Sequence, residues 1–191
     1  MSAIDHLIHA NERYAETFPG PRPLRPKLRL AVVACMDSRL DLFGALGLEI
    51  GDAHLIRNAG GLPTEEVLRS LAISQRRLGT REIVVIHHTE CGMEYFTNDV
   101  MGDLLERSLE TAELGPDGFR DIGTGPGSPA GREIDWLTIS DREQSVVDDV
   151  ARIRNHPLVE GTIPIHGFVY DVKCGRLVEI PAATRAGAPA V

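Results

Sequence analysis

Apolar residues in this 191-residue chain follow two patterns, short continuous runs and longer stretches with a helical period. Continuous runs of about four to eight apolar residues, bounded by turn signals, are typical of buried strands. These runs predict strands at residues 28–35, 53–58 and 83–88. Residues 163–172 alternate as a strand does, and residues 177–180 are expected to pair back with them as an antiparallel hairpin.

Stretches with the 3.6-residue period separate the expected strands. Helices are expected at residues 3–18, 40–46 and 99–114. A further helix is expected to begin after an N-cap at Thr64 and to end at Gly79. Another is expected to begin after a cap at Ser140 and to run to about Asn155. Strands alternating with helices favour right-handed crossovers and a parallel sheet. We therefore predict an α/β fold: a mostly parallel central sheet flanked by helices, with a C-terminal antiparallel hairpin strand and an N-terminal helical arm.

Chain length predicts a single domain over residues 1–191. Residues 1–27 form a helical arm with a proline-rich linker, and the arm packs either on a partner subunit or on its own domain. Nine of the 17 residues at 115–131 are glycine or proline, which predicts a flexible loop. Residues 181–191 are expected to fray.

Composition excludes several functional classes. A net charge of −8 argues against nucleic-acid binding, which needs a basic surface, and no apolar stretch approaches the ~20 residues of a membrane span. The first residues lack the layout of a signal peptide, so we expect a cytoplasmic protein without a nucleic-acid or membrane partner. An odd count of three cysteines favours metal binding or catalysis over a disulfide framework. Cys174 is expected to be a free thiol on the final hairpin.

Three residues suited to zinc lie where two buried strands end. Cys35 closes the first apolar run, and His88 and Cys91 close the third. Two thiolates and one imidazole suit zinc, and a set of three protein ligands leaves the fourth position for water or substrate. In parallel sheets such ends meet where the strand order reverses. His87, on the opposite face of its strand, is expected to pack or to form a hydrogen bond beneath the sheet.

Asp37 and Arg39 are expected to govern the fourth position. Zinc can lower the pKa of its water to about 7, which makes a hydroxide nucleophile available at neutral pH. If Asp37 pairs with Arg39, its carboxylate can accept a hydrogen bond from that nucleophile; unpaired, Asp37 could become the fourth ligand and close the site. The alternative is a surface ion pair that caps the next helix. Gly60 and Gly61 are candidate substrate-binding residues through their backbone N–H groups, or else form a plain strand-to-helix turn.

Residues 35–39 read Cys-Met-Asp-Ser-Arg, residues 57–61 read Arg-Asn-Ala-Gly-Gly, and residues 88–92 read His-Thr-Glu-Cys-Gly. These motifs resemble those of the β-class carbonic anhydrases. Within that family, the run Ser-Leu-Ala-Ile-Ser-Gln at 70–75 and the run Gly-Phe-Val-Tyr-Asp at 167–171 resemble the small actinobacterial-type branch. The resemblance extends from the N-terminal helix to the final hairpin, and departs from the family at the longer loop of residues 115–131. It implies reversible hydration of carbon dioxide to bicarbonate and a proton.

By the same resemblance, one Zn²⁺ per chain is bound by Cys35, His88 and Cys91, and Asp37 with Arg39 forms the gating dyad. The resemblance also implies a homodimer or a dimer of dimers, in which the N-terminal helix embraces the partner subunit. Carbonyl sulfide and carbon disulfide hydrolases resemble this family and share its zinc motif, so they are the main alternative. A zinc-stabilised or redox-sensing module without catalytic activity is the alternative of another class.

Overall fold

A five-stranded sheet forms the centre of the computed structural model, which describes residues 2–111, 113–116, 118–120, 123 and 125–190. The strand order is β2-β1-β3-β6-β7. The strands are β1 (Leu30–Cys35), β2 (Ala53–Asn58), β3 (Glu82–His88), β6 (Ile165–Tyr170) and β7 (Leu177–Glu179). Only β7 runs antiparallel to its neighbour. The predicted α/β architecture and C-terminal hairpin are therefore confirmed.

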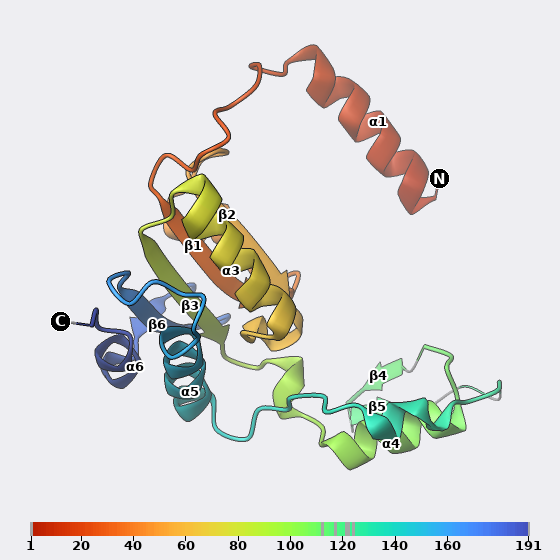
Figure 1. Ribbon diagram of the computed structural model, residues 1–191. Helices are drawn as coiled ribbons and strands as arrows, with labels where there is room; N and C mark the ends of the chain where they lie inside the picture. Colours follow the sequence, from red (N-terminus) through yellow and green to blue (C-terminus); the bar gives the residue numbers. More distant parts are fainter. Residues whose placement is uncertain (1, 112, 117, 121–122, 124, 191) are drawn as a thin grey trace.

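Three helices cover one face of the sheet (Figure 1). They are α3 (Glu65–Leu78), α5 (Arg142–Arg154) and α6 (Pro181–Ala186). Together they present apolar side chains to alternate residues of β1, β3 and β6, so the main core forms between the two layers. Gly167 on β6 allows this close approach, because a Cβ there would lie 2.4 Å from the Cβ of Ala183 and 2.6 Å from Cγ1 of Val146.

The opposite face of the sheet is covered less completely. The short helix α2 (Leu42–Leu46) packs there at the carboxyl end of β1 and ends at Gly47, which is left-handed with φ of 63°. Several large apolar side chains of this face remain only half-buried: Leu30, Leu55, Val84, Phe168, Tyr170 and Leu177. This face therefore has a buried cluster around Cys35 and Cys91, and the apolar residues around that cluster are only partly covered.

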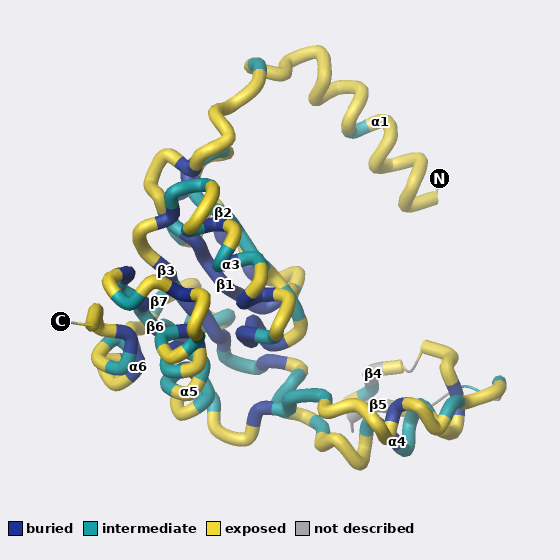
Figure 2. Tube along the Cα trace, in the orientation of Figure 1, coloured by how far each residue is buried: buried dark blue, intermediate teal, exposed yellow. Residues whose placement is uncertain are grey.

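The N-terminal helix α1 (Ala3–Glu16) stands away from the rest of the chain (Figures 1 and 2). Ser2 begins it with a capping box, in which the Ser2 hydroxyl accepts from the Asp5 N–H and the Asp5 carboxylate accepts from the Ser2 N–H. None of its residues is buried, and its apolar side chains are exposed: Ile4, Leu7, Ile8 and Tyr14, followed by Phe18. Packing of this helix on its own domain, one of the two expected arrangements, is not what the chain adopts.

Residues 98–136 form an extension beyond β3 that differs from the sequence-based expectation (Figure 1). The helix expected to reach residue 114 is α4 (Asn98–Arg107), and it ends there because the chain turns into the hairpin of β4 (Glu113–Gly115) and β5 (Gly118–Arg120). The predicted flexible loop at 115–131 is therefore wrong in part. Its last residues form a 3₁₀ turn, Pro129–Glu133, that lies on α4, and four of its residues (117, 121, 122 and 124) lie outside the described residues.

The C-terminal segment is also more ordered than expected. Residues 181–191 were expected to fray, yet α6 packs on the sheet with Ala183 fully buried. The Gly187 carbonyl accepts hydrogen bonds from Ile165 N–H at 3.0 Å and from the Arg154 guanidinium at 2.6 Å. These bonds tie the segment to β6 and α5, and residue 191 lies outside the described residues.

Two helix starts differ slightly from expectation. Helix α5 is capped by Asp141, whose carboxylate accepts from Gln144 N–H at 3.1 Å, and not by Ser140. Thr64 occupies the N-cap position of α3 as expected, but its side chain makes no capping hydrogen bond. Among the described residues, none of the helices combines the length and the apolar character that crossing a membrane requires.

Candidate metal centre

Cys35, His88 and Cys91 meet at the carboxyl end of the sheet, between β1 and β3. One ligand atom from each lies within 4.8 Å of the others, and all three residues are buried. β1 leads to β2 on one side and β3 leads to β6 on the other, so the strand order reverses between them. The predicted adjacency of the two strands is confirmed, and the cluster lies at the point where doubly wound sheets bind ligands.

The hydrogen bonds of His88 define its tautomer. Its Nδ1 lies 2.9 Å from the backbone oxygen of Thr89, and because a carbonyl only accepts, Nδ1 carries the proton. Nε2 therefore presents a lone pair to the two thiols. This atom is buried and has no hydrogen-bond partner among the described residues. A buried lone pair without a donor is costly unless a cation fills the position, which fits a metal ligand.

The pair of thiols readily loses one proton, from Cys35, and retains the other, on Cys91. A hydrogen bond from the Cys91 thiol lowers the pKa of Cys35 to about 4, and backbone N–H groups of Asp37 and Gly60 also favour the thiolate. The same pairing with Cys35, together with burial, raises the pKa of Cys91. The second proton is held because two thiolates would repel each other. A divalent cation removes that repulsion, so two sulfurs and one imidazole nitrogen fit Zn²⁺.

Asp37 lies beside this cluster and is held by Arg39. Its Oδ2 accepts from Arg39 Nη2 at 2.8 Å, and its Oδ1 accepts from Arg39 Nε at 3.0 Å and from Arg39 N–H at 2.9 Å. Oδ2 is 3.8 Å from Nε2 of His88. The Arg39 guanidinium lowers the pKa of Asp37 to about 2, and the pairing raises the pKa of Arg39. The carboxylate is thus ionised and paired, not free to turn.

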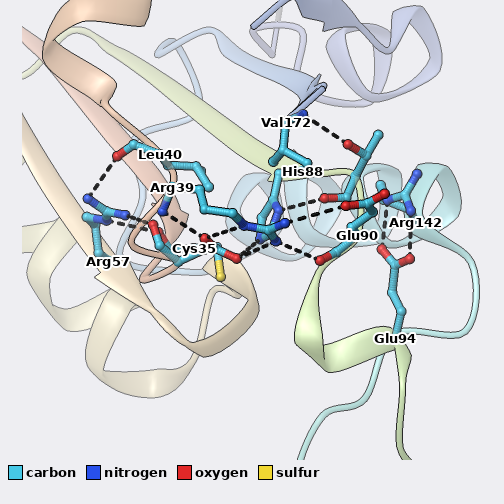
Figure 3. A network of polar contacts seen from close by, with 11 residues as sticks. Cys35, Arg39, Leu40, Arg57, His88, Glu90, Glu94, Arg142 and Val172 are labelled. Carbon is cyan, nitrogen blue, oxygen red and sulfur yellow. Dashed lines mark hydrogen bonds and ion pairs between the residues drawn. The ribbon is translucent and has the colours of Figure 1, made fainter. Parts of the chain in front are cut away.

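Arg39 is fixed in turn by the segment between His88, at the end of β3, and Cys91 (Figure 3). Its Nη2 donates to the Glu90 backbone oxygen at 2.9 Å, and its Nη1 lies 3.5 Å from Glu90 Oε2. Glu90 has a left-handed backbone with φ of 56°, and its side chain also pairs with Lys173 at 2.8 Å. The ion pair of Asp37 and Arg39 is therefore part of a network that joins β1, β3 and the final hairpin.

Arg57 on β2 positions the loop that carries Asp37, and sequence reasoning gave it no role of its own. Its guanidinium donates to three backbone oxygens, those of Cys35 at 2.9 Å, Asp37 at 2.6 Å and Leu40 at 3.3 Å (Figure 3). The planar fork of arginine spans these acceptors, which the single ammonium of lysine cannot do. The sequence did hold a signal for this role, because Arg57 is near the carboxyl end of its strand, the same end of the sheet as Cys35.

Replacing Arg57 with lysine is expected to lower zinc affinity or turnover about 10–100-fold, the usual effect of losing a residue that orients metal ligands. The cause is the loss of at least two of the three backbone contacts to the loop after Cys35. Zinc titration with a chromophoric chelator and turnover of the zinc-loaded protein measure the effect. Arg69→Lys is the matched control, since Arg69 is exposed and pairs with Glu66. Equal behaviour of the two variants would remove Arg57 from the site.

The glycine turn after β2 packs against β1. Gly60 and Gly61 have φ of 81° and 73°, and a Cβ on Gly61 would lie 2.7 Å from the backbone nitrogen of Cys35. Asn58 holds the turn, since its side chain donates to Leu62 O at 2.8 Å and accepts from Leu62 N–H at 2.9 Å. Gly60 lines the cavity described next, whereas Gly61 packs on β1. The substrate-binding role of these glycines stays a prediction.

A cavity of about 570 Å³ extends from the cluster toward α4. Its wall is mostly apolar: Met36, Met93, Phe96, Met101, Leu104, Leu105 and Trp136 line it together with Cys35, Asp37 and Cys91. Sequence reasoning missed the residues that α4 contributes. The signal was present, because Met101, Leu104, Leu105 and Ser108 follow helical spacing and so share one face.

Two further sequence-based predictions concern residues outside the cluster. His87 points to the opposite face, where its Nε2 lies 2.8 Å from Oδ2 of Asp149 on α5, as predicted. Burial raises the pKa of Asp149. Cys174 is an exposed free thiol on the turn before β7, also as predicted, and it donates a hydrogen bond to Asp171 at 3.2 Å. Neither His87 nor Cys174 belongs to the metal cluster.

Fold and site together define an α/β protein with a candidate metal centre of two cysteines and one histidine at the switch point of its sheet. The family profile described as carbonic anhydrase matches residues 30–177. β-Carbonic anhydrase 1 of Mycobacterium tuberculosis is 40% identical over 180 residues, which cover 94% of this chain and 99% of the relative. The chain belongs to the carbonic anhydrase family, and to its β class.

Solved structures and a second group of relatives agree with this assignment. The crystal structure of the carbonic anhydrase from Streptococcus mutans has a TM-score of 0.80 and 44% identity, and covers 94% of this chain and 98% of that one. A carbon disulfide hydrolase of Acidithiobacillus thiooxidans is 37% identical over 155 residues, which cover 78% of this chain and 75% of the relative. The relatives of this chain therefore carry two names, carbonic anhydrase and carbon disulfide hydrolase.

Proposed function

We propose that this protein is a zinc-dependent carbonic anhydrase that catalyses the reversible hydration of carbon dioxide to bicarbonate and a proton. The observation that carries the proposal is the open cluster of three ligands, with the unpartnered Nε2 of His88 beside a carboxylate that Arg39 holds. The family membership and the similarity to β-carbonic anhydrases support it.

One Zn²⁺ per chain would be held by Cys35, His88 and Cys91. When bound, zinc lowers the pKa of a coordinated water and so supplies a nucleophile near neutral pH. The residues around the site have separate tasks. Thr89 fixes the tautomer of His88 through its backbone oxygen, and the N–H groups of Asp37 and Gly60 stabilise the charge on the Cys35 sulfur.

Asp37 orients the attacking water. Its Oδ2 faces the cluster and stays ionised at every pH near neutrality, because the pKa of this carboxyl is about 2. An ionised carboxylate only accepts hydrogen bonds, so it directs the proton of the water toward itself and a lone pair toward substrate. Arg39 occupies both oxygens of Asp37 and so keeps this carboxylate from serving as a fourth ligand. Closure of the site would require that ion pair to break.

The apolar cavity admits the substrate. Carbon dioxide carries no net dipole, so a wall of methionine, leucine and aromatic side chains accepts it more readily than it accepts water. Gly60 lies on the cavity wall, and its N–H is directed at the Cys35 sulfur, so the substrate-binding role of Gly60 and Gly61 stays a prediction. The cavity does not select for small substrates by its size, because its volume of about 570 Å³ is larger than one triatomic molecule occupies.

Hydrolysis of carbon disulfide or carbonyl sulfide is the second candidate. The observation that favours it is the similarity to carbon disulfide hydrolases, whose substrates are attacked at carbon by the same kind of nucleophile. Parallel assays of carbon dioxide hydration and of sulfide release from carbon disulfide, on one zinc-loaded preparation, decide between them. Sulfide release without carbon dioxide hydration would overturn the main proposal. No turnover of either gas, with zinc bound, would favour the module without catalytic activity.

A homodimer, or a dimer of dimers, is the assembly we propose. Burying the exposed apolar side chains of α1 would be favourable, and the half-buried apolar face of the sheet is a surface on which they could pack. Because α1 stands away from its own sheet, the complementary surface is that of a second copy (Figure 2). We place this enzyme in the cytoplasm, in keeping with its expected reducing environment.

Deleting residues 1–18 is expected to convert the assembly to a smaller species, because the apolar face of α1 is lost from the interface. Light scattering coupled to size-exclusion chromatography measures the mass. The point variant Leu7→Asp should have the same effect, while the control Arg13→Gln, on the polar face of the helix, should not. An unchanged mass for both the deletion and Leu7→Asp would end the proposed role of the arm.

A further inference from the structure

Basic side chains gather at the amino end of the sheet, the end opposite the metal centre. Two adjoining depressions lie there, of about 660 Å³ and 470 Å³, and they share Arg25, Gly79 and Arg81 in their walls. We call them together the amino-end basic pocket. Its cationic residues are Arg22, Arg25, Lys27, Arg29, Arg76, Arg77 and Arg81. These are seven of the chain's 20 lysines and arginines.

Backbone hydrogen bonds hold the segments of the pocket together. The linker is joined to the loop before β2, since Lys27 N–H donates to Gly51 O at 2.9 Å. It is joined to the start of β3, since Arg81 N–H donates to Arg29 O at 2.7 Å. Arg29 itself has φ of 53°, a left-handed conformation that is costly for a residue with a side chain. The pocket is thus built on fixed backbone, with a strained residue at its centre.

Charge in the pocket is out of balance. Seven cationic groups face three carboxylates, those of Glu49, Asp52 and Glu160, in a chain whose net charge is −8. Asp52 is already engaged, accepting from Glu49 N–H at 2.8 Å and lying 3.8 Å from Lys27 Nζ. Within the described part of the chain, the guanidinium groups of the six arginines make no ion pair or side-chain hydrogen bond. By contrast, Arg39, Arg69, Arg132, Arg142 and Arg152 each pair with a carboxylate.

The C-terminal dipole of α3 explains only part of the cluster. Arg76 and Arg77 lie in the last turn of that helix, where cations are favoured. Arg25, Arg29 and Arg81 lie outside the helix and gain little from it. Unpaired guanidinium groups so close together repel one another, and a concave surface concentrates their field. An anion in the pocket would remove this repulsion.

We propose that the amino-end basic pocket binds a small multivalent oxyanion of the oligophosphate class. Guanidinium groups recognise phosphate oxygens by paired hydrogen bonds, and arginine outnumbers lysine here six to one. The volume of the pocket lies in the usual range for small ligands. The site is separate from catalysis, because β1, with six residues, places about 20 Å between its two ends.

Isothermal titration of the zinc-loaded full chain with sodium tripolyphosphate, at about 0.1 M salt, tests the proposal. We expect saturable binding that the double variant Arg25→Gln/Arg81→Gln weakens at least tenfold. The matched control Arg69→Gln/Arg152→Gln removes the same charge from paired, exposed arginines and should bind as the wild type does. Heat from extraction of zinc would be common to all three proteins and cancels in the comparison.

Two further readouts sharpen the test. Without ligand, the double variant should unfold at a higher temperature than the wild type at low ionic strength, because it loses like-charge repulsion. Its carbon dioxide hydration should equal that of the wild type, whatever the outcome of the titration. Absence of saturable binding, or an equal loss in the control variant, would overturn the proposal. Binding of a DNA oligonucleotide but not of tripolyphosphate, or a lower assembly mass in the double variant, would also overturn it, in favour of a nucleic-acid surface or a subunit interface.

Discussion

Replacing Cys35 with serine is expected to remove most of the bound zinc and, with it, all measurable hydration of carbon dioxide. Cys35 is the thiol whose pKa falls to about 4, so it is the more readily ionised sulfur of the pair. A serine hydroxyl stays protonated at neutral pH and is a poor zinc ligand. Losing one of three ligands should weaken binding by roughly 10²–10⁴-fold, about a third of the ~10–16 kcal/mol that cysteine and histidine sites supply.

Elemental analysis after dialysis against a weak chelator measures this loss. The wild type should retain about one zinc per chain, and Cys35→Ser far less. Cys174→Ser is the matched control, because it makes the same chemical change at an exposed thiol outside the cluster and should leave zinc unchanged. Retention of one zinc per chain by Cys35→Ser would refute the assignment of the metal centre.

Replacing Asp37 with alanine is expected to preserve zinc but to slow turnover by about 10²–10³-fold, the usual effect of removing one preorganised hydrogen-bonding group from an active site. The variant removes the carboxylate oxygen that lies 3.8 Å from Nε2 of His88, while the three ligands stay in place. Arg39 keeps its contacts with Glu90, so the loop should stay folded. Stopped-flow assays with measured zinc content separate the two effects, and Asp148→Ala, at an exposed carboxylate on α5, is the control.

The pH dependence of this variant is informative. The pKa of Asp37 is lowered from 3.8 to about 2 in the folded protein, so its pairing stabilises the fold above about pH 4 and this stabilisation is lost as the pH falls toward 2. Between about pH 6.5 and 9 the carboxylate does not titrate. A rise of activity with pH in that range must come from another group, so it should persist in Asp37→Ala at a lower level. Loss of the rise itself would contradict the role given to Asp37.

Much of the sheet and the cluster could be predicted because burial dictates both. Strands covered on one or both faces must be continuously apolar or alternate, which makes them visible in sequence. Once β1 and β3 are known to be parallel, their carboxyl ends lie at the same edge, so Cys35 and His88 must come close if the strands are neighbours. Residue type and position therefore predicted that Cys35, His88 and Cys91 come together, and metal binding by them stays a prediction.

Other features depend on contacts that local sequence does not express. Glycine and proline at 115–131 predicted flexibility, yet Arg132 pairs with Asp103 and Glu106 and anchors the segment on α4. The segment after residue 181 lacks a clear period, but its small residues fit against Gly167 and Arg154. Arg57 reads as one charged residue on an edge strand, and only the fold brings three carbonyls to it.

Stopped-flow hydration of carbon dioxide by the zinc-loaded wild type, from about pH 6.5 to 9, tests the central claim most directly. We expect fast turnover that rises with pH, is absent in Cys35→Ser and is unchanged in Cys174→Ser. Zinc-loaded protein that hydrates carbon dioxide no faster than buffer, with Asp37 and Arg39 intact, would contradict it.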